Sequence, residues 1–554
     1  MGRIRINQLG YTPGSSKQVI YTGEGKKFEI YSAENQELCY TGELKKARLD
    51  EASWDYISAG DFSTFQKQGR FYIQINEEKS YQFRISGELH RSFTDAVLKA
   101  YYYQRCGMEL TEEYAGEWKH PVCHLQPSYL FRQDAEELLR TKPEELVCID
   151  STGGWHDAGD YGRYTIASVK TLADLLLAYE HFPEAFQHSI HIPESEKDGA
   201  DILHEIRYGL DFLFKMQREK DGGVYTKVAT RNFPDMIMPE TDQEPLFVFN
   251  ISSPATGGFS AVMAMAAGIF KCFDPAYAKR CLKASEKAYG WLKQNPEPLF
   301  FYNPQNVRSG EYGDKVDTDE RYWAAAQLYR TTGKEEYHKD FLMHYGQLAN
   351  KLTLGWRSVG GYGSMAYLFT EQPVHQEIYE ALKKEWLKNA GELAQRSRDN
   401  GYGITLALNE YVWGSLMVLS NESITLILAE RLLKQSLYNE IIEHNWDYLL
   451  GMNPMDISYV TGFGENRVMH PHHRPSASDG IEEPVPGLIA GGPCANLLDE
   501  IAQEKRIGNP PAKCYIDHEM SFSTNEIDIY WNSPAVYVGA YLMQRSQNSG
   551  TPKQ

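Results

Sequence analysis

The chain has 554 residues, of which 42% are hydrophobic and 24% are charged. This composition is typical of a folded globular protein and excludes a disordered or fibrous one, and the length indicates at least two domains. The formal net charge of −19 and the lack of any run of Lys and Arg argue against a nucleic acid as partner, because a phosphate backbone needs a concentrated basic surface.

The N-terminal sequence, MGRIRINQLGY, contains no apolar signal-peptide core. No stretch approaches the roughly 20 apolar residues of a membrane span, so we expect no membrane partner. We expect a cytoplasmic protein if the chain is complete and a secreted one if a signal peptide has been removed. We also expect a monomer.

The first part of the chain, up to about residue 85, has the texture of short strands between turn residues. Apolar and polar positions alternate in KQVIYTG, KFEIYSA, ELCYTGEL, GRFYIQI and YQFRISG. We therefore predict a small β-sandwich domain over residues 1–88. Its sequence shows no row of aromatic residues like that of a sugar-binding face, so we expect it to pack against the rest of the chain and stabilise it.

Longer segments with helical period follow from about Ser92 onward. Two apolar stripes are formed by Ile166, Val169, Ala173 and Leu176, and by Ile202, Ile206, Leu210 and Leu213. Gly-rich and Pro-rich loops such as DSTGGWHDAGDYGRY separate these segments and carry polar and aromatic clusters. We predict a helical barrel or bundle over residues 89–548 with its site at one end, and a disordered tail over residues 549–554.

The segment GGWHDAGDYGRY places Asp157 and Asp160 three residues apart, among glycines that let the backbone turn tightly. If both acids face one cleft, their repulsion raises one pKa, and one acid can orient a water molecule that the other deprotonates. A helix N-cap explains an Asp at this place equally well, because the helical pattern TIASVKTLADLL follows directly.

Glu526 lies in the segment NEIDIYWNSP, close to Tyr530 and Trp531. Aromatic neighbours can desolvate a carboxyl group, which favours the neutral acid that a proton donor to a glycosidic oxygen must be. Taken alone, a surface Glu that caps the following helix is the commoner explanation.

His470, His472, His473 and Arg474 follow a Gly-rich turn in SYVTGFGENRVMHPHHRPS. Such polar donors suit the hydroxyl groups of a sugar. A metal site is the alternative, which we favour less because His472 and His473 are adjacent and no Cys or Asp lies at ligand spacing.

Together these elements resemble glycoside hydrolase family 9, the cellulases once called family E, in the form with an N-terminal immunoglobulin-like (Ig-like) domain. QLGY and DFSTFQKQGRFYI are similar to the Ig-like module, and YYYQRCG is similar to the first helix of the catalytic domain. DAGD, SYVTGFGENRVMHPHHR and the surroundings of NEIDIYWNSP are similar to the three catalytic signatures, and DGGVYTKV, RYWAAAQLY and DYLLGMNP also recur in the family. The resemblance runs over essentially the whole chain.

The resemblance implies a mainly α protein, an (α/α)6 barrel preceded by a small Ig-like β-sandwich. It also implies hydrolysis with inversion at the anomeric carbon, in which Glu526 is the general acid, Asp160 is the general base and Asp157 helps to hold the water. The acid and the base should then lie about 6.5–9.5 Å apart. His472 and Arg474 match the signature positions that contact the sugar.

Two further acids lie near the signatures. Asp517 matches a signature position with a structural or supporting role. Asp528 departs from the signature, in which the residue two after the catalytic Glu is usually small. Its carboxylate could raise the pKa of the acid, but we expect it to point away, since alternate residues of an extended segment face opposite sides.

Cys106, Cys123, His124 and His156 offer two thiolates and two imidazoles, a set that suits tetrahedral zinc. Spacing alone does not identify a site, because a free Cys is usually a buried hydrophobe. The resemblance does, since family members with the Ig-like domain show RCG, CH and WHDAGD around a structural zinc. Zinc would fix the Asp157 loop to the first helix, and its removal should damage stability before chemistry.

Calcium is a weaker candidate. Family members often bind it through acids near a segment that here reads SPATGGFSA, and Gly258 stands where an Asp is expected. Asp314 in GEYGDK remains as a candidate ligand. A hard cation needs several oxygen ligands, so the loss of a carboxylate lowers its affinity.

The leading hypothesis is an enzyme that cleaves β-1,4-linked gluco-oligosaccharides or β-glucan, and an unexported chain would trim imported oligosaccharides. The alternative is an exo-β-glucosaminidase on chitosan oligosaccharides, because an acidic protein suits cationic sugars. A hypothesis from a different class is a non-catalytic carbohydrate-binding protein. The joint presence of Asp157, Asp160 and Glu526 argues against it.

Overall fold

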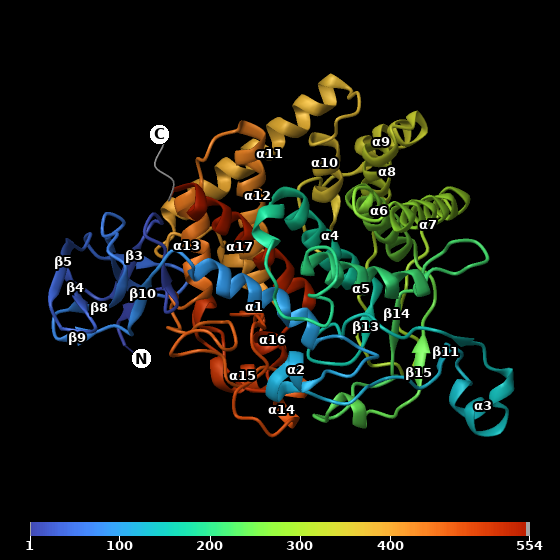
Figure 1. Cartoon of the computed structure of the whole chain (residues 1–554), viewed down its shortest axis with the longest axis horizontal. Coiled ribbons are helices and arrows are strands. Elements are labelled where there is room, and N and C mark those ends of the chain that lie inside the picture. Colours follow the sequence, from blue (N-terminus) through green and yellow to red (C-terminus); the bar gives the residue numbers. More distant parts are fainter. Residues whose placement is uncertain (1, 550–554) are drawn as a thin grey trace. The chain divides into compact units, whose positions relative to one another are not determined.

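The computed structural model describes residues 2–549 and divides into two compact units. The first unit comprises Met1–Ala100, Phe182–Ile190 and Trp386–Gln554, and the second comprises Tyr101–His181 and His191–Glu385. Strands make up the N-terminal part of the chain and helices most of the remainder (Figure 1). The predicted disordered tail lies outside the described residues, except for Ser549 at the end of the last helix.

Two sheets at the start of the chain form the predicted β-sandwich. One sheet has the order β1-β3-β7-β6, with bounds β1 Ile4–Arg5, β3 Gln18–Thr22, β7 Asp55–Asp61 and β6 Arg48–Asp50. The other has the order β2-β10-β8-β4-β5 with β9 beside β8, and its bounds are β2 Gly10–Tyr11, β10 Phe83–Ile85, β8 Gly69–Ile75, β4 Lys27–Ser32, β5 Leu38–Glu43 and β9 Glu78–Lys79. Val19, Phe28 and Ile73 are fully buried in the shared core. The five predicted strands coincide with β3, β4, β5, β8 and β10, which confirms that prediction.

The sandwich packs against the later segments of the first unit, as expected. Two buried polar contacts and a partly buried one lie at this junction. The buried ones are the ion pair Arg5–Asp456 at 3.1 Å and the bond from Asn7 Nδ2 to Asp447 Oδ1 at 2.7 Å, and the partly buried one is the bond from Ser16 N to Glu443 Oε2 at 2.7 Å. A charged side chain that is buried at this junction needs a partner on the facing segment, because desolvation of an unpaired charge is costly. The junction is therefore specific as well as tight.

One corner of the sandwich exposes aromatic rings that the sequence analysis did not anticipate. Leu49 and Tyr56 are cross-strand partners in β6 and β7, and Trp54 stands in the turn before β7. Trp54 and Tyr56 are 62% and 63% exposed. Alternation shows which residues share a face, but it does not show which face is covered.

The helices of the first unit begin with α1, Leu89–Tyr103, which runs on into the second unit. The others are α11 Gln376–Asp399, which starts in the second unit, α12 Ser415–Leu433, α13 Asn439–Leu449, α14 Arg474–Ser478, α15 Glu500–Arg506, α16 Phe522–Asn525 and α17 Ile529–Ser549. α17 packs so closely on α1 that a Cβ at Gly539 would lie 2.2 Å from Thr94 Oγ1. The short helices α14 and α16 adjoin the segments that resemble the catalytic signatures.

The second unit contains α2 Glu112–Ala115, α3 Ala135–Thr141, α4 Thr165–His181, α5 Asp201–Met216, α6 Ser253–Phe270, α7 Pro275–Gln294, α8 Thr318–Thr332, α9 Glu335–Gln347 and α10 Gly360–Leu368. The two predicted stripes fall in α4 and α5. By length and composition α6 could cross a membrane, which the sequence analysis missed, but 89% of it is buried inside the fold. A core helix meets the same criteria.

A sheet of very short strands crosses the loops of the second unit, where we expected few strands. Its order is β12-β11-β15-β14-β13, with bounds β12 Cys148–Ile149, β11 Ser128–Leu130, β15 Leu246–Val248, β14 Lys227–Ala229 and β13 Arg163–Tyr164. Strands of two or three residues are too short for a periodic signal. This sheet carries the loop with the paired acids.

Candidate active site

The paired acids lie on a tight loop between β12 and β13. The amide of Asp157 donates to Gly162 O at 2.9 Å, and Asp160 Oδ2 accepts from Gly162 N at 3.0 Å. Gly154 has a left-handed φ of +76°, and a Cβ there would lie 2.6 Å from the Phe212 ring. Since α4 begins only at Thr165, Asp160 shapes the loop and does not cap the helix.

Both carboxyl groups are buried, and each is held through one oxygen. Asp157 Oδ2 accepts from Tyr312 Oη at 2.5 Å, whereas Asp157 Oδ1 has no hydrogen-bond partner. Asp160 Oδ2 also accepts from Tyr164 Oη at 3.3 Å. Burial raises the pKa of Asp157 well above its ordinary value, the bond from Tyr312 opposes this, and the charge of Asp160 adds to it. The sequence analysis attributed a raised pKa in this pair to repulsion between the two acids, but here burial is the larger cause.

Glu526 lies between α16 and α17 in the first unit and is partly exposed. Its backbone forms a bridge with His472, and its carbonyl accepts from Gly491 N at 2.8 Å. His472 N donates to Asn525 O at 2.9 Å. The structure therefore brings the predicted acid and the predicted sugar-binding His onto adjacent backbone segments.

Asp517 joins the segments on both sides of this bridge. Its two oxygens accept from the amides of Met469 and His470 at 2.8 and 2.9 Å, and Asn525 Nδ2 donates to Oδ1 at 2.9 Å. Tyr515 Oη donates to Asn525 Oδ1 at 2.5 Å. This network gives Asp517 the supporting position that the resemblance implied.

Asp528 is buried and faces the start of α17. Its Oδ1 accepts from Tyr530 N at 3.0 Å, and its carbonyl accepts from Trp531 N at 3.1 Å. The residue that caps the following helix is thus Asp528 and not Glu526. The preference for an Asp528 side chain that points away from the acid agrees with this placement.

Aromatic side chains flank each group of acids, and the sequence analysis did not single them out. Trp413 is 45% exposed and contacts Phe522 with a centroid distance of 5.4 Å, and Phe522 lies 6.4 Å from the His472 ring. In the second unit, Tyr312 lies against Trp356 at 5.0 Å. Aromatic residues are frequent throughout this chain, so composition alone could not distinguish them.

The predicted site residues thus fall into two groups. Asp157 and Asp160 belong to the second unit, and Glu526 and His472 belong to the first. Arg474 is buried in the first unit at the start of α14.

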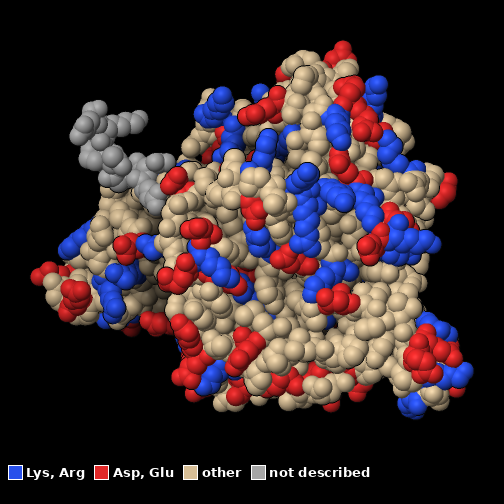
Figure 2. Space-filling view, turned by 45° about the vertical axis from the view of Figure 1, so that its right-hand side comes forward, with Lys and Arg blue, Asp and Glu red and all other residues tan. Residues whose placement is uncertain are grey.

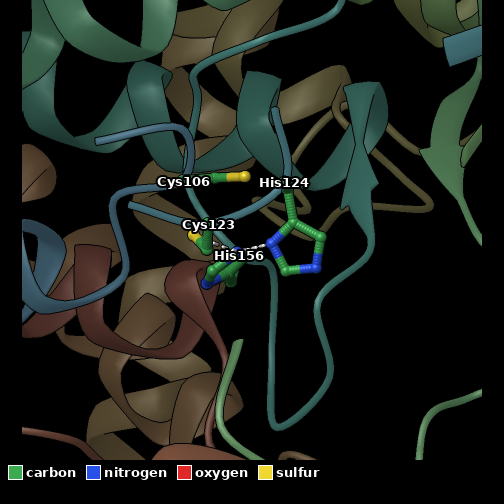
Figure 3. Close-up of side chains that lie close together, drawn as sticks. All are labelled: Cys106, Cys123, His124 and His156. Carbon is green, nitrogen blue, oxygen red and sulfur yellow. Dashed lines mark hydrogen bonds between the residues drawn. The ribbon is translucent and has the colours of Figure 1, made fainter. Parts of the chain in front are cut away.

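The predicted metal ligands converge in the second unit (Figure 3). One ligand atom from each of Cys106, Cys123, His124 and His156 lies within 4.8 Å of the others, and all four residues are buried. His124 Nδ1 and His156 Nε2 are 3.3 Å apart. Although burial raises it, the neighbouring Cys123, Arg163 and His156 lower the pKa of the Cys106 thiol well below its usual range. Two thiols and two imidazoles at this spacing fit one tetrahedral metal ion.

This cluster adjoins the acid loop through the backbone as well. Cys106 N donates to Gly154 O at 2.8 Å, and His156 N donates to Gln104 O at 2.7 Å. A metal ion held by Cys106 and His156 would reinforce these bonds directly before Asp157.

Comparison with known proteins now identifies the family. The model of glycosyl hydrolase family 9 matches residues 91–539, and the model of the cellulase N-terminal Ig-like domain matches residues 1–80. The chain belongs to glycosyl hydrolase family 9. A cellodextrinase of Butyrivibrio fibrisolvens is 37% identical over 98% of this chain and 100% of its own length.

Solved structures of family 9 enzymes confirm the predicted fold class. A single-mutant thermostable endoglucanase from Alicyclobacillus acidocaldarius superposes with a TM-score of 0.91, 35% identity and coverage of 98% of this chain and 100% of its own. A Zn-binding triple mutant of a family 9 endoglucanase gives a TM-score of 0.88 at 31% identity, with coverage of 96% and 99%. The chain is therefore a family 9 hydrolase with an (α/α)6 barrel and an Ig-like domain, and its Cys/His cluster has the ligands and the spacing that could hold a metal ion.

The calcium candidates do not meet at Gly258. A Cβ at Gly258 would lie 2.9 Å from Val169 Cγ1, so this position faces the apolar core. Asp314 is buried near Asp319 and Glu320 instead, and burial raises its pKa to about 6. Among the described residues, the Cys/His cluster is the group of at least three His, Cys, Asp or Glu side chains that brings its ligand atoms within 4.8 Å of one another.

Proposed function

We propose that this family 9 enzyme hydrolyses β-1,4-linked gluco-oligosaccharides with inversion, with Asp160 as general base and Glu526 as general acid. The observation that carries the assignment is the geometry of the acid loop. Asp157 and Asp160 are each tied through Oδ2, which leaves an oxygen of each for the water and its proton. A carboxylate pair arranged in this way suits the activation of water, and it contributes little to holding the fold together.

In this mechanism Asp160 takes a proton from the attacking water while Asp157 orients that water through Oδ1. Glu526 gives its proton to the leaving oxygen on the opposite side of the sugar ring. An inverting enzyme needs about 6.5–9.5 Å between acid and base to leave room for the water. His472 and Arg474 would hold sugar hydroxyl groups, and Trp413 offers an apolar face on which a sugar ring can stack.

We propose zinc as the metal of the Cys/His cluster. Its donor set of two thiolates and two imidazoles is closed and buried, which suits a structural ion and leaves no position for a substrate. The ion would fix the loop that precedes Asp157. Calcium near Asp314, Asp319 and Glu320 is a weaker proposal, which rests on an unpaired oxygen in each of these buried acids.

We further propose that the enzyme acts as a monomer on soluble oligosaccharides, without a nucleic-acid or membrane partner. The name of the cellodextrinase relative supports an oligosaccharide substrate. Both signs of charge occur across the face drawn in Figure 2, an arrangement typical of a surface that remains in water. We propose a location in the cytoplasm, or outside the cell if a signal peptide has been removed. Cell fractionation would test this.

A substrate panel tests this function. The enzyme is incubated with cello-oligosaccharides, mixed-linkage glucan, xyloglucan and chitosan oligosaccharides, and products are resolved by chromatography over time. We expect cleavage of cello-oligosaccharides to be fastest. Faster release of glucosamine from chitosan oligosaccharides would favour the exo-β-glucosaminidase alternative, and binding of all these sugars without products would favour the non-catalytic one.

A further inference from the structure

A half-buried side chain, Tyr312, reaches the acid loop from a segment far away in the sequence. Tyr312 Oη donates to Asp157 Oδ2 at 2.5 Å across 155 residues. The backbone of Tyr312 has a φ of 48°, a left-handed conformation that costs a bulky residue energy and is found where the surroundings enforce it. This backbone conformation accompanies the placement of the Tyr312 phenol against the Asp157 carboxyl group.

Neighbouring rings restrict the Tyr312 side chain. Its ring lies 4.7 Å from the Tyr164 ring and 5.0 Å from the Trp356 ring, measured between centroids. Tyr164 in turn donates to Asp160. The two phenols therefore pack together while each of them binds one of the two acids.

Lys227 holds the segment that precedes Tyr312. Its side chain is almost fully buried, and its ammonium group donates to Asn303 Oδ1 at 2.8 Å, Ser309 Oγ at 3.1 Å, Ser309 O at 3.2 Å and Gly310 O at 2.6 Å. The ammonium also lies 4.5 Å from the centroid of the Phe249 ring. In the sheet, Lys227 is the register partner of Tyr164.

A buried Lys of this kind needs an explanation. Desolvation of an ammonium group is costly unless its donors are paired, and here the partners are two backbone carbonyls, a hydroxyl and a side-chain amide oxygen of one loop. Burial lowers the pKa of Lys227 to about 7, although Asp160 and Glu311 oppose this. An apolar residue would fill the same space at lower cost, so the side chain serves to fix the loop.

We propose that Tyr312 is a positioning residue that orients Asp157 for the reaction, and that Lys227 is a second positioning residue that holds the Tyr312 loop. The proposal rests on the proposed function, since it assigns Asp157 to the attacking water. With Oδ2 tied to the phenol, rotation of the carboxyl group is blocked and Oδ1 stays directed to one place. Such preorganisation acts on the rate and not on the binding of the sugar.

The first test compares Tyr312→Phe with Tyr302→Phe, which removes a hydroxyl from an exposed Tyr nearby in the chain. For Tyr312→Phe we expect kcat on cellotetraose to fall about 10-fold to 100-fold, the range for the loss of one hydrogen bond to a carboxylate. KM should change less than about threefold, since the lost bond does not touch the sugar. Thermal midpoint and metal content should match those of the wild type. Unchanged kcat, or a loss that appears in KM alone, would overturn the proposal.

The dependence of the rate on the leaving group distinguishes this role of Tyr312 from a role in protonation of the leaving group. A dinitrophenyl cellobioside needs little protonation of its leaving group, so Glu526→Gln should retain most of its activity on that substrate. Tyr312→Phe should be slowed on both substrates by the same factor. If the dinitrophenyl substrate rescues Tyr312→Phe, Tyr312 acts on departure of the leaving group and the proposal fails. If wild-type protein cleaves neither substrate, the proposed function itself fails.

A double-mutant cycle tests the link to Lys227. Lys227→Met keeps about the same side-chain volume but removes the ammonium donors. If Lys227 acts through Tyr312, the double variant should be about as slow as the slower single variant. Losses that multiply would show that Lys227 acts independently, which overturns that part of the proposal. The cycle is read from kcat per metal-loaded folded protein, so incomplete folding of one variant does not alter the outcome.

Discussion

The two groups of residues that we propose to be catalytic are built in different ways. The acid loop of the second unit is buried, lies beside a Cys/His cluster that can take a metal ion, and is held by the phenols of Tyr164 and Tyr312. The Glu526 segment of the first unit is partly exposed and is held by an amide and carboxylate network around Asp517 and Asn525. Holding the water requires a fixed carboxylate pair, whereas proton donation tolerates a side chain that meets its partner only when the sugar is bound.

This comparison predicts unequal behaviour of the two carboxylates proposed as base and acid. Asp160→Asn and Glu526→Gln should each lower kcat on cello-oligosaccharides by about 10²-fold to 10⁴-fold, the usual contribution of general acid or base catalysis. Steady-state kinetics on cellotetraose and on an aryl cellobioside with a good leaving group distinguish them. Only the Glu526 variant should recover with the good leaving group. Recovery of the Asp160 variant would reverse the two assignments.

Loss of the metal should damage the second unit first. Cys123→Ser removes one of four ligands, and because ligand binding contributes to folding we expect the calorimetric midpoint to fall by about 5 °C or more. Cys148→Ser is the matched control, since Cys148 is an exposed cysteine outside the cluster. Elemental analysis should find zinc in the control and little in Cys123→Ser. Equal zinc content in both proteins would remove the cluster from the account.

The junction of the Ig-like domain makes the first unit sensitive to pH. Burial raises the pKa of Glu443 from 4.5 to about 7, opposed by the bond from Ser16 N and by Arg545. The folded state therefore holds this proton more tightly than the unfolded state, and stability falls as pH rises from about 4.5 to 7, by roughly 3 kcal/mol at most. Glu443→Gln should flatten the dependence of the thermal midpoint on pH over that range. Glu500→Gln, at an exposed Glu of α15 in the same unit, should leave it unchanged, and an equal effect of both variants would contradict this origin.

The network around Glu526 gives a smaller effect. Asp517→Ala leaves the amides of Met469 and His470 and the Asn525 side chain without an acceptor, which should cost about 1–3 kcal/mol of stability and lower kcat. Asp517→Asn keeps one acceptor oxygen and should lose less on both measures. Chemical denaturation and kinetics on the same preparations check this order. If the two variants behave alike, the carboxylate does not hold the segment.

The strands of the sandwich and the main site residues were predictable from the sequence. The contacts between distant segments were not, because they form only in the fold. The strands of the sandwich follow from alternation, whereas Asp157, Asp160 and the four predicted metal ligands were identified through the resemblance of their motifs to those of the family. Tyr312 and Lys227 lie in segments quoted in the sequence analysis, GEYGDK and DGGVYTKV. Their roles still carried no local signal, because each acts over a distance in sequence that only the fold closes. The two-residue and three-residue strands that carry the acid loop also lack any period. Exposure of Trp54 and Tyr56 depends on which face of the sandwich is covered.

The stereochemistry of the first product tests the central claim most directly. Wild-type enzyme is added to cellotetraose and the anomeric protons are followed by NMR before mutarotation sets in. A base and an acid on opposite sides of the sugar predict that the newly formed reducing end appears first as the α-anomer. If the β-anomer appears first, the reaction proceeds with retention, and the roles given to Asp160 and Glu526 are wrong.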